Sequence, residues 1–204
     1  MTTIPKPYSA ACDRNRDPIL EVLRRHFADR KRVLEIGSGT GQHAVYFAAA
    51  LAHLTWQTTE RMDELDGVRA WLAEARLPNT PAPLTLDVRT DWPTHHYDAA
   101  FTANTLHIMS WDEVRTMFEH LPDTLAEDAK VTVYGPFNYG GRFTSESNQR
   151  FDASLRARVT HMGIRDFEAV NELARSIGLT LLEDLAMPAN NRTLVWQRSA
   201  TKDA

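Results

Sequence analysis

A glycine-rich segment, Gly37–Gly41 with the sequence GSGTG, constrains this chain more than any other feature. It follows a short apolar run, Arg32–Ile36, that predicts a strand, and it precedes an alanine-rich run, Gln42–Ala52, that predicts a helix. Glycine permits positive φ angles and lets a ligand approach the backbone closely. The segment therefore predicts a tight turn from a strand into a helix, of the kind that cradles a ligand. The alternative is a tight turn that binds nothing.

Predicted strands and helices alternate through the first two thirds of the sequence. After the strand at 32–36, further strands are expected at 54–59, 84–88, 97–103 and 130–134. The expected helices cover 17–26, 42–52, 62–76 and 112–126. This alternation predicts an α/β fold, with a parallel sheet covered on both faces and a ligand at the carboxyl ends of the strands. Beyond residue 135 we expect a loop to residue 163, a helix at 166–177 and a closing pair of strands at 179–182 and 193–198.

Size and charge indicate one ordinary domain, spanning residues 1–204. The 23 Lys and Arg against 27 Asp and Glu give a formal net charge of −4, unlike the basic surface of nucleic-acid-binding proteins. No apolar run reaches the roughly 20 residues that span a bilayer, and the first residues lack a secretion-signal pattern. The single cysteine, Cys12, fits a reducing compartment. We therefore expect a cytoplasmic protein without nucleic-acid or membrane partners, and no metal site, because His95-His96 lacks companion ligands.

Two cofactors compete for the glycine turn. A dinucleotide fingerprint has the spacing G-x-G-x-x-G and places a pyrophosphate at the helix N-terminus. Here the third glycine, Gly41, comes one residue early, and Glu35 would repel a pyrophosphate. S-adenosylmethionine has no phosphate and carries a sulfonium and an ammonium, which a carboxylate stabilises. The turn thus favours S-adenosylmethionine; alternatively, Glu35 is a structural carboxylate that accepts nearby amides.

The motif E-x-G-x-G-x-G after the first strand resembles the cofactor motif of class I S-adenosylmethionine-dependent methyltransferases. The resemblance implies a Rossmann-like, mostly parallel seven-stranded sheet with helices on both faces and a terminal antiparallel strand. Other segments are similar to one poorly characterised methyltransferase-like family, a domain of unknown function: Tyr134–Phe137, Ser147-Asn148, Phe151-Asp152, Gly163–Asp166 and Met187–Asn191. This similarity extends from about Pro7 to Trp196 and does not identify a substrate.

The resemblance also implies which residues bind the cofactor. In class I enzymes an acidic residue that ends the second strand holds both ribose hydroxyls, and Glu60 takes that place here. An acidic residue at the end of the third strand, here Asp87, accepts from the adenine amino group, and the next backbone amide, of Val88, pairs with the ring. The alternatives are a solvated Glu60 and an Asp87 that starts a turn. The full expected set is Arg14, Asn15, Glu35, Gly37, Ser38, Gly39, Thr40, Gly41, Glu60, Asp87, Val88, Asn104, Thr105 and His107.

The acceptor is expected beyond the fourth strand, where the resemblance places Ala103–Ile108 beside the methyl group. This segment lacks the Asn/Asp-Pro-Pro-aromatic sequence of methylases that act on exocyclic base amines. His107 is the best-placed general base, and we expect a pH dependence between about 6 and 8 from its titration. The alternative is a histidine that ties down backbone. Tyr134 and Asn148 complete the expected catalytic set.

Two segments are expected to cover the site. Residues 1–16 would close over the cofactor, with Arg14-Asn15-Arg16 at its carboxylate; the alternative is that these three residues only start a helix. Cys12 would be a small packing residue. Residues 135–165 would form a loop over the acceptor pocket, or an insertion folded for its own packing. The expected lining of this pocket is Tyr134, Phe137, Asn138, Tyr139, Phe143, Asn148 and Phe151. Arg165-Asp166 and Asn190-Asn191 either lie at its mouth or cap the last helix and the final turn.

These observations predict an S-adenosylmethionine-dependent methyltransferase that transfers the methyl group in line to an oxygen, nitrogen or sulfur of a small molecule. One alternative is an S-adenosylmethionine-binding protein without catalysis, acting as a sensor or partner subunit. A nicotinamide-dependent oxidoreductase is disfavoured by the glycine spacing and by Glu35. The sequence names neither the acceptor nor the oligomeric state.

Overall fold

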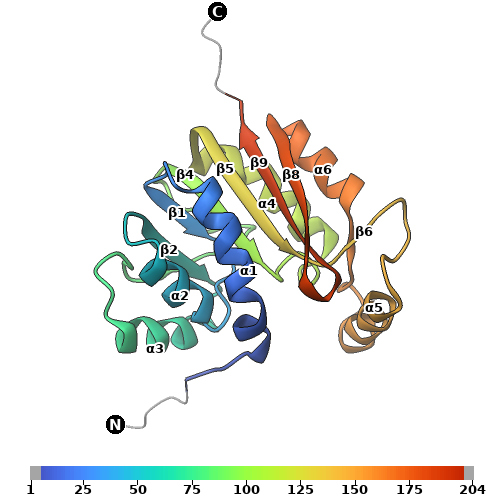
Figure 1. Ribbon diagram of the computed structural model, residues 1–204, viewed down its shortest axis with the longest axis horizontal. Coiled ribbons are helices and arrows are strands. Elements are labelled where there is room, and N and C mark those ends of the chain that lie inside the picture. The colour runs from blue at the N-terminus through green and yellow to red at the C-terminus, as the bar shows by residue number, and fades with distance from the viewer. Residues whose placement is uncertain (1–5, 200–204) are drawn as a thin grey trace, which may run out of the picture.

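The computed structural model describes residues 6–199 and contains one seven-stranded sheet in the order β3-β2-β1-β4-β5-β9-β8 (Figure 1). Its strands are β1 (Arg32–Glu35), β2 (Thr55–Glu60), β3 (Leu84–Thr85), β4 (Tyr97–Ala103), β5 (Leu125–Gly135), β8 (Leu179–Met187) and β9 (Asn191–Arg198). All neighbours pair in parallel except β9, which runs antiparallel to both β5 and β8. The predicted mostly parallel sheet with one antiparallel strand is confirmed.

Helices cover both faces of the sheet, as the sequence pattern predicts. On one face lie α1 (Ala10–His26) and α2 (Gln42–Ala50), with α3 (Leu65–Ala75) beside α2 and β2. On the other face lie α4 (Trp111–Thr124) and α6 (Phe167–Ser176). The core under α1 and α2 centres on three fully buried rings, Phe47, Trp56 and Phe101, whose centroids lie 5.5 to 5.8 Å apart. Burying side chains of this size stabilises the fold by roughly 1.5–3 kcal/mol each.

The strand order reverses next to β1, which lies between β2 and β4. The chain therefore leaves the carboxyl ends of β1 and β4 toward opposite faces, and a crevice opens between the two connections. The glycine turn that follows β1 and the segment that follows β4 both begin at this edge of the sheet. The fold thus brings together residues that lie about 70 positions apart in the sequence.

The first helix begins earlier than the predicted residue 17. It starts at Ala10, so Pro18 lies inside α1 rather than in its first turn. Residues 10–17 carry no apolar periodicity, and the pattern therefore did not reveal this part of the helix. The prediction of the third strand to residue 88 was also wrong, since β3 ends at Thr85 and the Asp87 carboxylate then accepts the amide of Arg89 at 2.9 Å, which turns the chain.

The predicted loop at 135–163 contains a helix, α5 (Glu146–Arg158), which was missed. A short strand, β6 (Phe137–Asn138), pairs in parallel with β7 (Arg165–Asp166), and α5 lies between them in the chain. The buried residues of α5 are Asn148, Asp152 and Leu155, which share one helical face but are mostly polar. Hydrophobic periodicity could not reveal such a helix. In Figure 1, α5 stands at one side of the sheet, close to the turn between β8 and β9.

Within residues 6–199, no helix combines the length and the apolar composition that crossing a membrane requires.

Candidate cofactor and acceptor site

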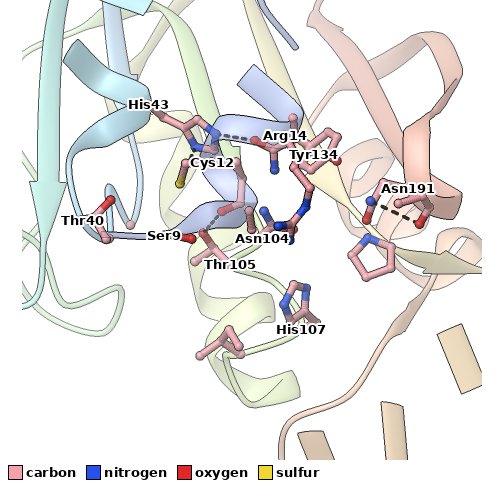
Figure 2. Close-up of a pocket in the computed structure, with 18 of the residues that line it drawn as sticks. Ser9, Cys12, Arg14, Thr40, His43, Asn104, Thr105, His107, Tyr134 and Asn191 are labelled. Atoms are coloured by element: carbon pink, nitrogen blue, oxygen red, sulfur yellow. Dashed lines mark hydrogen bonds between the residues drawn. The ribbon is translucent and has the colours of Figure 1, made fainter. Parts of the chain in front are cut away.

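A cavity of about 1000 Å³ lies at the carboxyl ends of β1, β2, β4 and β5 (Figure 2). The structure brings most of the expected site residues to its wall. These are Arg14, Asn15, Glu35, Gly37, Ser38, Gly39, Thr40, Glu60, Asn104, Thr105, His107, Tyr134 and Asn148. Residues from four strand ends, from α1 and from α5 thus share one cavity.

Three expected cofactor residues do not line this cavity. Gly41 precedes α2 with a φ of 90°, and a Cβ there would lie 3.1 Å from the Cα of Val68, so this glycine serves close packing of α3 against the turn. Val88 is buried in the core. The Asp87 carboxylate accepts a hydrogen bond from the backbone amide of Arg89. This contact agrees with the alternative in which Asp87 starts a turn. Adenine recognition by Asp87 and Val88 stays a prediction.

Glu35 is the buried carboxyl of the cavity, with 2% of its surface exposed. Its Oε2 accepts hydrogen bonds from the hydroxyl of Ser38 at 2.8 Å and from the indole N–H of Trp56 at 3.0 Å. Burial raises the pKa of Glu35 to about 7, the charge of Glu60 acts in the same direction, and the two hydrogen bonds oppose them. The carboxyl is therefore poised between its neutral and ionised forms near neutral pH, and a cation beside it would favour the ionised form.

Glu60 ends β2 and joins the strand to the glycine turn. Its Oε2 accepts the amide of Gly39 at 2.7 Å, and its Oε1 accepts the amide of Arg61 at 2.9 Å. Gly39 has a φ of 56°, and within residues 6–199 no neighbouring atom lies within 4 Å of the position that a Cβ would take. The absence of a side chain there leaves the backbone open to the cavity, beside the carboxylate that is expected to hold a ribose.

His107 lies in the segment after β4 and faces the edge of the Phe151 ring at a centroid distance of 5.3 Å. Its backbone carbonyl accepts the amide of Gly163 at 3.0 Å. Of the two places expected for Arg165, the mouth of the pocket is wrong, because Arg165 does not line the cavity. Its guanidinium donates instead to the carbonyls of Leu106, at 3.0 Å, and Met109, and so holds the segment that carries His107.

Burial sets the protonation state of His107. Its side chain is 5% exposed, and burial together with the positive charge of Arg165 lowers its pKa to about 4. The imidazole is therefore neutral at physiological pH and acts only as a weak base. The expected titration between pH 6 and 8 was wrong, because the sequence gives no measure of how deeply a histidine after a strand is buried.

Asn148 fastens α5 to the turn between β8 and β9. Its side-chain amide donates to the hydroxyl of Thr144 at 2.9 Å and to the carbonyl of Asn190 at 3.0 Å. The Asn190 amide in turn donates to the hydroxyl of Ser147 at 3.1 Å. In this turn Ala189 and Asn190 both have a φ of 57°, a conformation that side chains disfavour and that these contacts hold in place. Both N–H groups of Asn148 are thus engaged within the protein, and its expected catalytic role stays a prediction.

Several expected pocket residues lie elsewhere. Of the seven residues predicted to line the acceptor pocket, Tyr134, Asn148 and Phe151 do so. Phe137 is buried in the core, and Tyr139 stacks on Phe167 at 5.1 Å and donates to the Asp184 carboxylate at 2.7 Å. Asn138, Phe143 and Asp166 do not line the cavity, and Asn191 does. Tyr139 thus serves the packing of α6 and β8 rather than the site.

Sequence reasoning missed Cys12 and His43, which line the cavity from α1 and α2. Cys12 is half-buried, and its sulfur lies 3.9 Å from Nδ1 of His43 (Figure 2). The position of His43, two residues after the glycine turn, is the one signal that could have indicated it. Among the residues that the structure describes, no three metal-ligating side chains cluster.

Comparison with known families places this site in context. Residues 6–198 match the protein family of unknown function DUF938. The chain belongs to this family. The resemblance to a methyltransferase-like family without an established activity is thereby confirmed.

Solved methyltransferases share the fold. The chain aligns with an O-methyltransferase family protein from Burkholderia thailandensis at a TM-score of 0.81 and 16% identity, over 91% of this chain and 57% of that one. The apo S-adenosylmethionine-dependent methyltransferase SibL aligns at 0.78 and 23% identity, over 93% and 56%. PigF, solved with SAH, aligns at 0.76 and 15% identity, over 89% and 55%. The chain spans a little over half the length of these proteins, and the likeness shows the class I methyltransferase fold.

The raised pKa of Glu35 predicts how stability depends on pH. A folded pKa of about 7 above a reference of 4.5 means that the native state binds the extra proton, so wild-type stability falls as the pH rises from 4.5 to beyond 7. Glu35→Gln removes this effect. Without ligand, the difference in the free energy of unfolding between Glu35→Gln and wild type should therefore shift by roughly 3 kcal/mol in favour of the variant as the pH rises from 4.5 to 8. Urea unfolding at several pH values measures the gain; parallel pH profiles of the two proteins would contradict it.

The lowered pKa of His107 predicts the opposite slope in acid. The folded pKa of about 4 lies below the reference of 6.5, so the unfolded state takes up a proton more readily than the native state. The free energy of unfolding is therefore highest above pH 6.5, and this contribution is lost as the pH falls through 4. His107→Gln should therefore lose roughly 3 kcal/mol less stability than wild type between pH 6.5 and pH 4. NMR of the labelled imidazole gives the pKa directly, and a His107 midpoint above 6 would disprove the assignment.

Proposed function

We propose that this protein is an S-adenosylmethionine-dependent methyltransferase that acts on a nucleophilic oxygen, nitrogen or sulfur of a small molecule. The observation that carries the proposal is Glu35, a buried carboxyl on the cavity wall whose two hydrogen-bond donors, Ser38 and Trp56, are both uncharged. A carboxyl in that position favours a cationic ligand. S-adenosylmethionine brings both a sulfonium and an ammonium.

The remaining residues of the turn fit the same cofactor. The open backbone at Gly39 and the carboxylate of Glu60 lie together, as ribose recognition needs. Glu35 and Glu60 both line the cavity, and two carboxylates there disfavour the pyrophosphate of a nicotinamide dinucleotide. The volume of about 1000 Å³ is at the upper end for sites of small ligands, which suits a cofactor together with an acceptor.

The acceptor half of the cavity has little charge. Beyond Tyr134 and His107 it is lined by the apolar side chains of Ile108, Pro136 and Phe151, with the polar groups of Ser147 and Asn191. Aromatic and proline faces with a few hydrogen-bonding groups suit a small, partly aromatic and uncharged molecule. This composition supports a small-molecule acceptor over a nucleic acid.

The chemistry needs little from the protein beyond positioning. When bound, the cofactor supplies a methyl group that its sulfonium already activates. The walls of the cavity exclude water and hold an acceptor in line, which can supply much of the rate. His107 is neutral and can accept the proton of the acceptor. Because its conjugate acid is strong, that transfer is favourable once the attacking atom has bonded to carbon and has become more acidic. The geometry thus suits an acceptor whose lone pair attacks before its proton leaves.

We also propose a cytoplasmic location, supported by the single cysteine of the sequence, whose thiol is free.

Ligand binding tests the proposed cofactor. Calorimetry should show binding of S-adenosylmethionine or S-adenosylhomocysteine and no measurable binding of NAD. Glu60→Ala removes hydrogen bonds of about 1.5–3 kcal/mol each to the ribose, so the Kd for S-adenosylhomocysteine should rise at least about tenfold.

The matched control is Glu74→Ala, which removes an exposed carboxylate that is paired with Lys6. It should leave the Kd unchanged. Binding of NAD alone would disprove the cofactor assignment, and equal affinities of both variants and wild type would show that Glu60 has no part in it. The protein is then incubated with S-adenosylmethionine and each member of a panel of metabolites. Formation of S-adenosylhomocysteine with one of them indicates an enzyme, and its absence with all of them indicates a sensor without catalysis.

A further inference from the structure

A chain of three side chains joins α1 to α2 along the cavity wall. Nε2 of His43 lies 2.7 Å from Oδ1 of Asn15, and Nδ1 of His43 lies 3.9 Å from the sulfur of Cys12. His43 is 6% exposed and Asn15 is 7% exposed, and all three residues line the cavity. Figure 2 shows Cys12 and Arg14 on α1 beside His43. Nothing in the cofactor motif accounts for this arrangement.

The hydrogen bonds of this chain have a defined direction. Burial raises the pKa of Cys12, so its thiol keeps the proton, and its sulfur lies 3.9 Å from Nδ1 of His43. Burial, together with the charge of Arg16, lowers the pKa of His43 to about 4, so the ring is neutral. Because Oδ1 of Asn15 can only accept a hydrogen bond, the one ring proton lies on Nε2. The Nε2–H then donates to Oδ1 of Asn15. This leaves the N–H groups of Asn15 on the side away from His43.

The ring of His43 packs against two core rings. It stacks on Phe47 at 5.2 Å with an interplanar angle of 12°, and it meets the edge of Phe101 at 6.5 Å. Both partners belong to the fully buried core. Because the imidazole is packed in the core, its hydrogen bond fixes the position of the Asn15 side chain on α1.

Asn15 lies on the side of the cavity where the amino-acid end of the expected cofactor would bind. Glu60 on β2 is the expected ribose ligand, so the amino-acid end lies toward β1 and β4, under α1. At this point α1 presents the amide of Asn15 and the guanidinium of Arg14 to the cavity. Amide and guanidinium N–H groups together match a carboxylate.

We propose that His43 is a positioning residue that fixes the orientation of Asn15, so that the Asn15 amide, together with Arg14, binds the carboxylate of the cofactor's methionine moiety. The inference rests on the proposed function, since it needs an S-adenosyl ligand in the cavity. The contact of Arg14 and Asn15 with the carboxylate is the one expected from the sequence; the inference adds to it His43, which positions Asn15 and does not contact the reacting atoms.

Two probes separate this role from a general effect on the fold. S-adenosylhomocysteine carries the amino-acid carboxylate, and 5′-methylthioadenosine has the same adenosine without the amino acid. His43→Gln places an amide N–H near the position of Nε2 and can still donate to Asn15. His43→Asn is shorter and places its amide near Nδ1, so it cannot. Calorimetry of both ligands with the wild type and both variants gives the comparison.

With His43→Asn, the Kd for S-adenosylhomocysteine should rise at least about tenfold, and the Kd for 5′-methylthioadenosine should stay within about twofold. His43→Gln should remain close to wild type with both ligands. Asn15→Asp is the second variant: it keeps the oxygen that accepts from His43 but places a negative charge beside the ligand carboxylate. It should weaken S-adenosylhomocysteine selectively even if His43→Asn does not fold.

The outcomes are distinct. A wild type that binds neither ligand contradicts the proposed function and this inference with it. A wild type that binds S-adenosylhomocysteine, with variants that bind it equally tightly, overturns this inference alone. An equal loss for both ligands in His43→Asn and Asn15→Asp also overturns it, because that result indicates a structural role.

Discussion

The buried carboxyl of Glu35 is the interaction on which the site depends. It joins the end of β1 to the side chain of Trp56 on β2 and to Ser38 in the glycine turn. The turn is held to β2 a second time, because the Ser38 amide donates to the carbonyl of Thr59 at 2.9 Å and the Thr59 hydroxyl donates to the carbonyl of Glu35 at 2.7 Å. Burying a carboxyl costs free energy, and only two uncharged donors offset that cost here. These hydrogen bonds hold the turn against β2. Without a ligand the pKa of the Glu35 carboxyl is raised, and a bound cation would lower it.

Burial drives three titratable groups of the cavity, Glu35, His43 and His107, toward their neutral forms. It raises the pKa of Glu35 and lowers those of His43 and His107. Each of these groups therefore serves a different purpose without carrying a full charge. Glu35 can ionise against a cation, His43 can hold one proton in one direction, and His107 can accept a proton late.

The sequence predicts the sheet well, and it also predicts most of the residues that line the cavity at the glycine turn, because both follow from local rules. Glycine spacing, the carboxylate before Gly37 and apolar strand patterns depend on neighbours in the chain. The acceptor half is harder. The buried face of α5 contains Asn148 and Asp152, whose amide and carboxylate are satisfied by distant backbone. The contacts of Cys12 and His43 cross between two helices. Such features depend on tertiary structure, and neither composition nor periodicity encodes them.

Proton release on binding tests the central claim most directly. At pH 6 a Glu35 carboxyl with a pKa of about 7 is mostly protonated, and a cationic cofactor beside it would displace that proton. Calorimetry of S-adenosylmethionine in buffers of different ionisation enthalpy measures the number of protons exchanged. The wild type should release roughly 0.9 proton at pH 6, and Glu35→Gln should release none. Binding without proton release in the wild type, or the same release in both proteins, would contradict a role for Glu35 in holding the cation.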